Sequence, residues 1–212
     1  LLSWSDPAED IGRIVLQLPI SGLAILILGL GLDQAYIREY YAAKDKASLF
    51  KSISLSPFVL TTVVILAVLV WNTAWPADLI FDLPDKTLGL LFLIFLLTCL
   101  FARFLSLILR MQEKAVAFSL SQLTPKFLIL ALVLLFVFSG VETDTVSLVL
   151  AYTVAQVLTV AVLTYQTRHE LRAAARAPWS SETHHASMRS GLPVAVGHLA
   201  SSGLRSLERL AL

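Results

Sequence analysis

Long apolar stretches alternate with short polar segments along the whole chain. A membrane-crossing helix needs about 20 mostly apolar residues. Six stretches approach this pattern, namely residues 11–31, 53–71, 88–109, 127–140, 146–165 and 191–212. The fourth is short, and Pro125 and Lys126 stand at its entrance, where a lysine can reach back to the lipid headgroups. The pattern predicts an all-α fold, a polytopic transmembrane helix bundle.

The composition excludes a soluble globular domain. The 212 residues are 57% hydrophobic and 15% charged, whereas an ordinary soluble domain has about 25% charged residues. The net charge of +1 shows no large excess of basic residues of the kind that binds nucleic acid, so we expect no nucleic-acid partner. The single cysteine, Cys99, lies inside an apolar stretch and offers neither a disulfide nor a cysteine metal framework.

Lysine and arginine are distributed very unevenly between the two sets of connections. Lys and Arg in short connections mark the cytoplasmic side. Twelve of them fall in one set: Arg38, Lys44, Lys46, Lys51, Arg103, Arg110, Lys114, Lys126, Arg168, Arg172, Arg176 and Arg189. The other set has Arg13 and Lys86. We therefore expect residues 72–87 outside the cell membrane and residues 166–190 in the cytoplasm.

The polar stretch 166–190 divides the chain into membrane units. We expect a transmembrane bundle over residues 1–165, a cytoplasmic linker over 166–190, and the first helix of a second bundle over 191–212. The chain begins at Leu1 without a methionine and stops inside an apolar stretch, which predicts that both ends continue in a longer protein. His184 and His185 have no partner ligands at metal spacing, so we interpret them as loop residues and expect no metal site. No pattern typical of a catalytic site stands out, and we predict that the protein is not an enzyme.

Three motifs at the ends of predicted spans resemble segments of a known family of membrane proteins. They are Gly31-Leu-Asp-Gln-Ala-Tyr-Ile-Arg-Glu-Tyr-Tyr41, Arg110-Met-Gln-Glu-Lys114 leading into Ala117-Phe118-Ser119, and Gly191-Leu-Pro193 followed by Ser206-Leu-Glu-Arg-Leu210. In this order they resemble the polysaccharide exporters of the multidrug/oligosaccharidyl-lipid/polysaccharide superfamily, which include the O-antigen flippases. The resemblance implies that the six stretches are helices two to seven, the N-terminal half of a two-bundle transporter.

The resemblance also implies a function. Such a protein moves a polyprenyl-diphosphate-linked oligosaccharide from the cytoplasmic to the periplasmic leaflet of the bacterial inner membrane by alternating access. Membrane lipid, a glycan polymerase and other polysaccharide-assembly proteins are the implied partners, and no cofactor is implied. Since the cavity lies between two bundles, we expect the chain alone to be inactive.

A lipid diphosphate calls for fixed positive charge inside the membrane, where an idle ion costs about 2.5–3.5 kcal/mol. Arg205 and Arg209 lie one helical turn apart with Glu208 beside them, and we predict that they supply charge to the substrate site. Two alternatives stay open. Glu208 neutralises one arginine within the helix, or the segment is an interfacial helix.

Three further polar residues are candidates for substrate binding. Arg103 lies near the cytoplasmic end of its span, where snorkelling to the headgroups is the alternative. Gln34 and Arg38 share one face of what we interpret as a continuation of the first helix. This face could line the polar entrance of the substrate cavity, or it could anchor the helix at the membrane–water interface, and both alternatives fit the sequence. Gln156 is interpreted as an interhelical hydrogen-bonding residue.

Other functional classes compete. A cation-coupled multidrug antiporter of the same superfamily should place carboxylates inside its bundle, and the apolar cores of the five spans before residue 166 contain none. A non-transporting membrane scaffold or a glycan polymerase component is the third class. Polymerases usually need a large outer loop, and the longest one expected here is residues 72–87.

Overall fold

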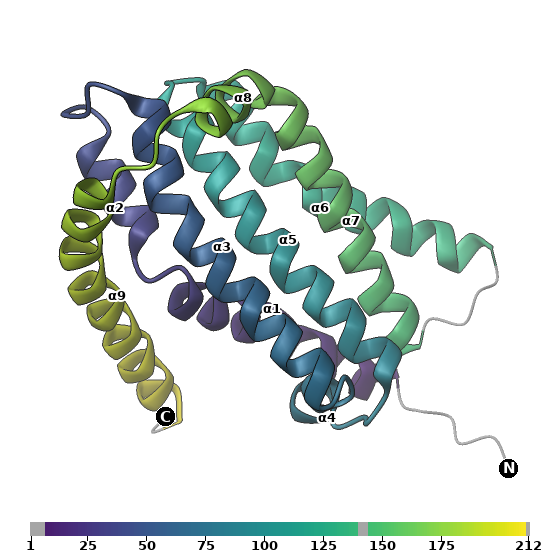
Figure 1. Cartoon of the computed structure of the whole chain (residues 1–212). Helices are drawn as coiled ribbons and strands as arrows, with labels where there is room; N and C mark the ends of the chain where they lie inside the picture. The colour runs from purple at the N-terminus through teal and green to yellow at the C-terminus, as the bar shows by residue number, and fades with distance from the viewer. Residues whose placement is uncertain (1–6, 140–143, 211–212) are drawn as a thin grey trace, which may run out of the picture.

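The computed structural model describes residues 7–139 and 144–210, with side chains for residues 12–139 and 144–197. Every element in these ranges is helical (Figure 1), which confirms the all-α prediction. The helices are α1 (Pro7–Leu28), α2 (Leu32–Glu39), α3 (Lys46–Trp71), α4 (Trp75–Phe81), α5 (Lys86–Met111), α6 (Ala115–Phe138), α7 (Thr145–Gln166), α8 (Arg168–Arg176) and α9 (Ser181–Leu210).

The chain is a multi-pass membrane protein by helix length and hydropathy. Among the described residues, α3, α5, α6 and α7 are each long and apolar enough to cross a bilayer, and the bent pair α1–α2 makes a fifth candidate. Their apolar side chains remain exposed on the outer surface, as on Val70 and Phe138. Such a surface is stable only against lipid or further protein. The sixth predicted span, residues 191–212, falls mostly on residues whose side chains are outside the described part.

Helix α5 forms the centre of the bundle (Figure 1). It contacts α1, α2, α3, α4, α6 and α7. Leu100 and Phe104 on α5 are each 1% exposed, and they belong to a core that includes Ile53 of α3 and Leu163 of α7. A polar side chain in the middle of α5 can therefore lie between several helices.

Aspartates set the starts of three spans. Asp45, Asp85 and Asp144 are extended residues immediately before α3, α5 and α7, and each carboxylate accepts hydrogen bonds from backbone N–H groups of the first turn. These bonds satisfy donors that have no partner within the helix. The expected outer loop contains α4, a short helix whose second residue is Pro76.

The first span is broken, which corrects the prediction of one continuous helix. Leu30 and Gly31 adopt left-handed backbone angles, with φ of 54° and 67°. Helices α1 and α2 consequently meet at 63°. A β-carbon on Gly31 would lie 2.3 Å from the carbonyl oxygen of Gly191, so the break occurs where α9 presses against the chain. Gly31 is thus a site of close packing between the chain and α9.

The fourth predicted span is longer than expected. Helix α6 has 24 residues and passes through Pro125 and Lys126 without a break. The apolar pattern missed its first turns because Ser119, Ser121 and Gln122 interrupt them. Ser121 instead bonds within the helix, its hydroxyl donating to the carbonyl of Phe118.

The expected linker is mostly helical and docks on the bundle. Lys51 Nζ donates to the carbonyl oxygens of Ala177 and Ala175 at 2.8 and 3.1 Å, which satisfies acceptors at the end of α8. His184 lies in α9 rather than in a loop, and its Nδ1 is 2.9 Å from the carbonyl of Ser52. These contacts come from distant segments, so the local pattern could not show them.

Candidate functional site

A polar cavity of about 310 Å³ lies inside the helix bundle. Its lining residues come from α1, α5, α6 and α7 and are Ile25, Cys99, Ala102, Arg103, Ser106, Ser121, Gln122, Pro125, Gln156, Thr159 and Leu163. The polar ones include two pairs spaced three residues apart, Arg103 with Ser106 and Gln156 with Thr159. Residues at this spacing share one helix face, so α5 and α7 each direct a polar face into the cavity.

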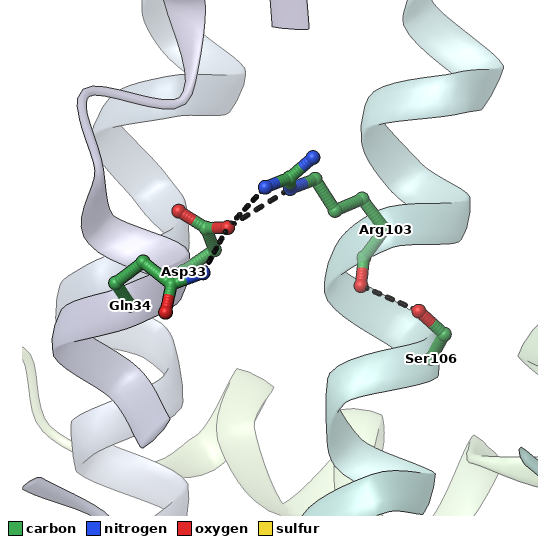
Figure 2. Close-up of polar contacts among 4 residues, drawn as sticks. All are labelled: Asp33, Gln34, Arg103 and Ser106. Atoms are coloured by element: carbon green, nitrogen blue, oxygen red, sulfur yellow. Dashed lines mark hydrogen bonds and ion pairs between the residues drawn. The ribbon is translucent and has the colours of Figure 1, made fainter. Parts of the chain in front are cut away.

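Arg103 forms an ion pair with Asp33 at the edge of this cavity (Figure 2). The Nε of Arg103 lies 3.0 Å from Oδ2 of Asp33, and Nη2 binds the same oxygen. The side-chain amide of Gln34 donates to that oxygen at 3.3 Å. The third guanidinium nitrogen points away from Asp33 (Figure 2), so Arg103 retains donor capacity toward a ligand.

The two partners differ in burial. The Asp33 side chain is 6% exposed and that of Arg103 is 40% exposed. The break at Gly31 places Asp33 in the first turn of α2, where a carboxylate also interacts favourably with the helix dipole. Arg103 lies eight residues before the end of α5 at Met111, about 12 Å along the axis. The structure thus holds a partly exposed positive group away from the end of α5, against a buried carboxylate.

The structure brings together Gln34 and Arg103 but places Arg38 elsewhere. Nη2 of Arg38 donates to the carbonyl of Ser190 at 2.7 Å, and the neighbouring Glu39 accepts a hydrogen bond from Ser187 at 2.6 Å. Both contacts join α2 to α9. Arg38 therefore acts in helix docking in this conformation and is not among the cavity-lining residues.

The three candidates in the last segment lie outside the described side chains. Arg205, Glu208 and Arg209 belong to the helical backbone of α9, and nothing further is described of them. Their role in substrate binding stays a prediction.

For two residues of the cavity, the interpretation based on the sequence differs from what the structure shows. Snorkelling was the alternative for Arg103, whereas its guanidinium is held by Asp33 within the bundle. Gln156 was interpreted as an interhelical hydrogen-bonding residue, and it lines the cavity. The spacing of Gln156 and Thr159, matched by Arg103 and Ser106, was the signal available in the sequence.

The chemistry of the cavity suits an anion. A guanidinium binds phosphate oxygens through two parallel hydrogen bonds and keeps its charge at any physiological pH. The amides of Gln122 and Gln156 add neutral donors. The hydroxyls of Ser106 and Thr159 already donate to the backbone carbonyls of Arg103 and Ala155, at 2.8 and 2.7 Å. Within the described residues, no three His, Cys, Asp or Glu side chains gather as a metal site would require.

Comparison with protein families gave a match over nearly the whole chain. The model of a family described as polysaccharide biosynthesis protein matches residues 7–212. Comparisons with curated proteins and with solved structures gave no match. The family match covers the broken first span, the polar cavity and α9 together. By this match the chain belongs to the polysaccharide biosynthesis protein family, a family of multi-pass membrane proteins that includes flippases.

Proposed function

We propose that this protein is a flippase that carries a polyprenyl-diphosphate-linked oligosaccharide across the bacterial inner membrane, from the cytoplasmic to the periplasmic leaflet. The observation that carries the proposal is Arg103, a permanent cation at a polar cavity within a bundle of membrane-spanning helices. A doubly charged headgroup must leave water to cross the bilayer, and a fixed guanidinium offsets part of that cost. The family match supports a polysaccharide as the cargo.

Asp33 gives Arg103 a partner while no substrate is bound. An unpaired charge within the bundle would be costly, and the ion pair offsets part of that cost. When a diphosphate approaches, the third guanidinium nitrogen binds it first, and the diphosphate then competes with Asp33 for the other two. The site can thus bind and release the headgroup without leaving a bare cation behind.

The test is export measured in cells that depend on the full-length protein. Arg103→Ala should reduce delivery of glycan to the periplasm by about tenfold or more, since hydrogen bonds to charged groups contribute about 1.5–3 kcal/mol each. Arg103→Lys should recover part of the loss, because it restores charge without the bidentate fork. Arg110→Ala is the matched control: it removes one arginine from the exposed end of the same helix. Normal export by Arg103→Ala at normal abundance would refute the role of Arg103.

Arg205 and Arg209 are proposed to add positive charge to the same substrate. Their replacement by Gln together should abolish export if both contact the diphosphate. Normal export by the double variant, with normal membrane insertion, would reduce both arginines to structural partners of Glu208.

A cation-coupled multidrug antiporter is the second candidate, and the burial of Asp33 favours it. The sequence argument against this class was the lack of carboxylates inside the spans, and Asp33 is now found inside the bundle. Its bond to Arg103 favours an anionic cargo instead. Asp33→Asn distinguishes the two, because an antiporter would lose drug resistance whereas a flippase would keep Arg103 and retain glycan export per folded molecule.

A further inference from the structure

Lys126 lies at the middle of a helix that is long enough to cross the membrane. Helix α6 begins at Ala115 and ends at Phe138, so eleven of its residues precede Lys126 and twelve follow. At about 1.5 Å per residue, Lys126 is about 17 Å along the axis from the first residue and about 18 Å from the last. Charged side chains at such a depth are rare, and they usually face a polar interior and serve a function.

The length of α6 argues against a position of Lys126 at the lipid headgroups. If Lys126 lay at the membrane surface, residues 127–138 would have to cross the hydrocarbon alone. They extend about 18 Å, whereas the hydrocarbon core is about 30 Å thick. The four-carbon stem of a lysine reaches roughly one helical turn, about 5.4 Å, which does not close the difference. We therefore place the ammonium of Lys126 below the headgroups.

Lys126 shares a polar face of α6 with Ser119 and Gln122. The three residues follow one another at spacings of three and four, which places them on one side of the helix. All three are exposed on the surface of the bundle. Lys126 makes no ion pair or hydrogen bond with the residues that the structure describes. Hydrocarbon is a costly environment for such a face, so the face requires water or a polar ligand.

This polar face is continuous with the cavity of Arg103. Gln122 belongs both to the face and to the lining of the cavity, and Pro125, the residue before Lys126, also lines it. From α7 the lining includes Gln156, which lies at the middle of that helix. The cavity thus reaches the middle of the membrane, where Lys126 lies. Arg103 and Lys126 consequently border one polar region, and Gln122 belongs to both parts of it.

We propose that Lys126 is a second cationic residue of the substrate site and binds the diphosphate headgroup together with Arg103. The inference rests on the proposed flippase function, because that function supplies the doubly charged ligand. A diphosphate has two phosphate groups, so cations on α5 and α6 can each pair with one of them while the amide of Gln122 donates to a neighbouring oxygen. Arg103 must exchange Asp33 for the substrate, whereas Lys126 has no carboxylate partner among the described residues and is available at once.

Thiol labelling of the full-length protein in membranes tests whether Lys126 faces water. The variant Lys126→Cys, in a Cys99→Ala background, should react with a charged methanethiosulfonate reagent, because the thiolate that reacts forms in water. Phe127→Cys is the matched control, since Phe127 is an exposed apolar neighbour that should face lipid and stay unlabelled. This measurement does not depend on the cargo. An unreactive cysteine in place of Lys126 would overturn the inference even where glycan export is demonstrated.

Export by cells that depend on the full-length protein tests the charge. Lys126→Gln should reduce delivery of glycan to the periplasm by about tenfold or more, as expected for the loss of a hydrogen bond from a charged group, and Lys126→Arg should retain most of it. Lys86→Gln is the matched control, because it removes an exposed lysine from the first residue of α5. An aminoethyl methanethiosulfonate, which places an ammonium on the cysteine of Lys126→Cys, should restore export, and the neutral methyl reagent should not.

The outcomes separate this inference from the proposed function. Normal export by Lys126→Gln at normal abundance, together with lost export by Arg103→Ala, would overturn the role of Lys126 alone. Normal export by both variants would overturn the substrate site as a whole. Where Lys126→Gln fails to insert, the modified Lys126→Cys variant decides: equal export after the aminoethyl and the methyl reagent would show that charge at this position is not used.

Discussion

Arg103 illustrates how one residue acquires its properties from its neighbours. It is the only basic residue between Lys86 and Arg110, and at that position a lone charge in lipid would be costly. Asp33, at the start of α2, accepts hydrogen bonds from its guanidinium, and the amide of Gln34 donates to the same carboxylate oxygen. The same contacts that stabilise Arg103 also keep it at the cavity.

Asp33→Asn should lower the melting temperature of the purified protein. The variant leaves Arg103 without its counter-charge, and breaking a buried pair typically costs about 3–5 kcal/mol, less here because Arg103 is partly exposed. The double variant Asp33→Asn with Arg103→Gln should regain most of the lost stability, because it replaces the ion pair by two neutral amides. A double variant as unstable as the sum of the single ones would show that the two side chains act independently.

Gly31→Ala should destabilise the protein strongly, whereas Gly22→Ala should not. At residue 31 the β-carbon of an alanine would lie 2.3 Å from the carbonyl oxygen of Gly191, and the alanine would also have to adopt a φ of 67°. At residue 22 nothing lies within 4 Å of the position, and alanine favours a helix by about 1 kcal/mol over glycine. Thermal unfolding of both variants in detergent measures the difference. Equal melting temperatures would mean that α2 and α9 do not approach each other so closely.

At the scale of helices, boundaries are set by side chains that satisfy the first backbone donors. Asp85 accepts a hydrogen bond from the N–H of Leu88 at 3.1 Å and another from Thr87. These bonds, from Leu88 first and then from Thr87, hold the pKa of Asp85 below its usual value. The carboxylate is therefore charged over the whole physiological range and fixes the start of α5.

Asp85→Ala should lower stability at pH 7 by about 1 kcal/mol, the usual effect of losing such a cap. Because the pKa of Asp85 is lower in the folded than in the unfolded protein, its contribution is present above the unfolded pKa of about 3.9. It is lost as the pH falls through the lower folded pKa. The melting temperatures of wild type and variant should consequently converge in acid. Asp78→Ala, in the neighbouring α4, serves as the control, and a constant difference at every pH would contradict the assignment.

The docking of the 166–190 segment is a second property at this scale. The face of α8 that carries Leu171 and Ala174 packs on the core, while Lys51 and Ser48 of α3 bind carbonyl oxygens near its end. A segment that the composition suggests is a tether is instead part of the bundle. Helix α9 is likewise held on α2 and α3 by side-chain hydrogen bonds of Arg38, Glu39 and His184.

For the whole molecule, the uneven distribution of lysine and arginine predicts one orientation in the membrane. Asp78 in α4 and Ala175 in α8 are both exposed. Helices α4 and α8 lie at opposite ends of α3 and α5 (Figure 1). The charge rule predicts that α4 is periplasmic and α8 cytoplasmic.

Single cysteines at these two positions test the orientation, in a Cys99→Ala background. In intact spheroplasts, a membrane-impermeant thiol reagent should label the cysteine that replaces Asp78. The cysteine that replaces Ala175 should react only after lysis. The reverse pattern would invert the orientation.

The sequence alone determined which of the described segments are long and apolar enough to cross a membrane, because transfer of a helix into lipid depends on the composition of that helix rather than on its neighbours. The all-α class and the starts of α3, α5 and α7 at their capping aspartates follow from equally local chemistry. The order of motifs along the chain indicated the family, and the match over residues 7–212 confirmed it.

Tertiary structure alone decided which polar residues meet. Asp33 and Arg103 are 70 residues apart, and no periodicity records that one reaches the other. Their contact depends on the break at Leu30 and Gly31, and Gly31 lies against Gly191 on a helix distant in the sequence. The same reason explains why Arg38 binds Ser190 rather than the cavity: the partner of a long polar side chain is fixed by how helices cross, which is a property of the packed bundle and not of any one segment.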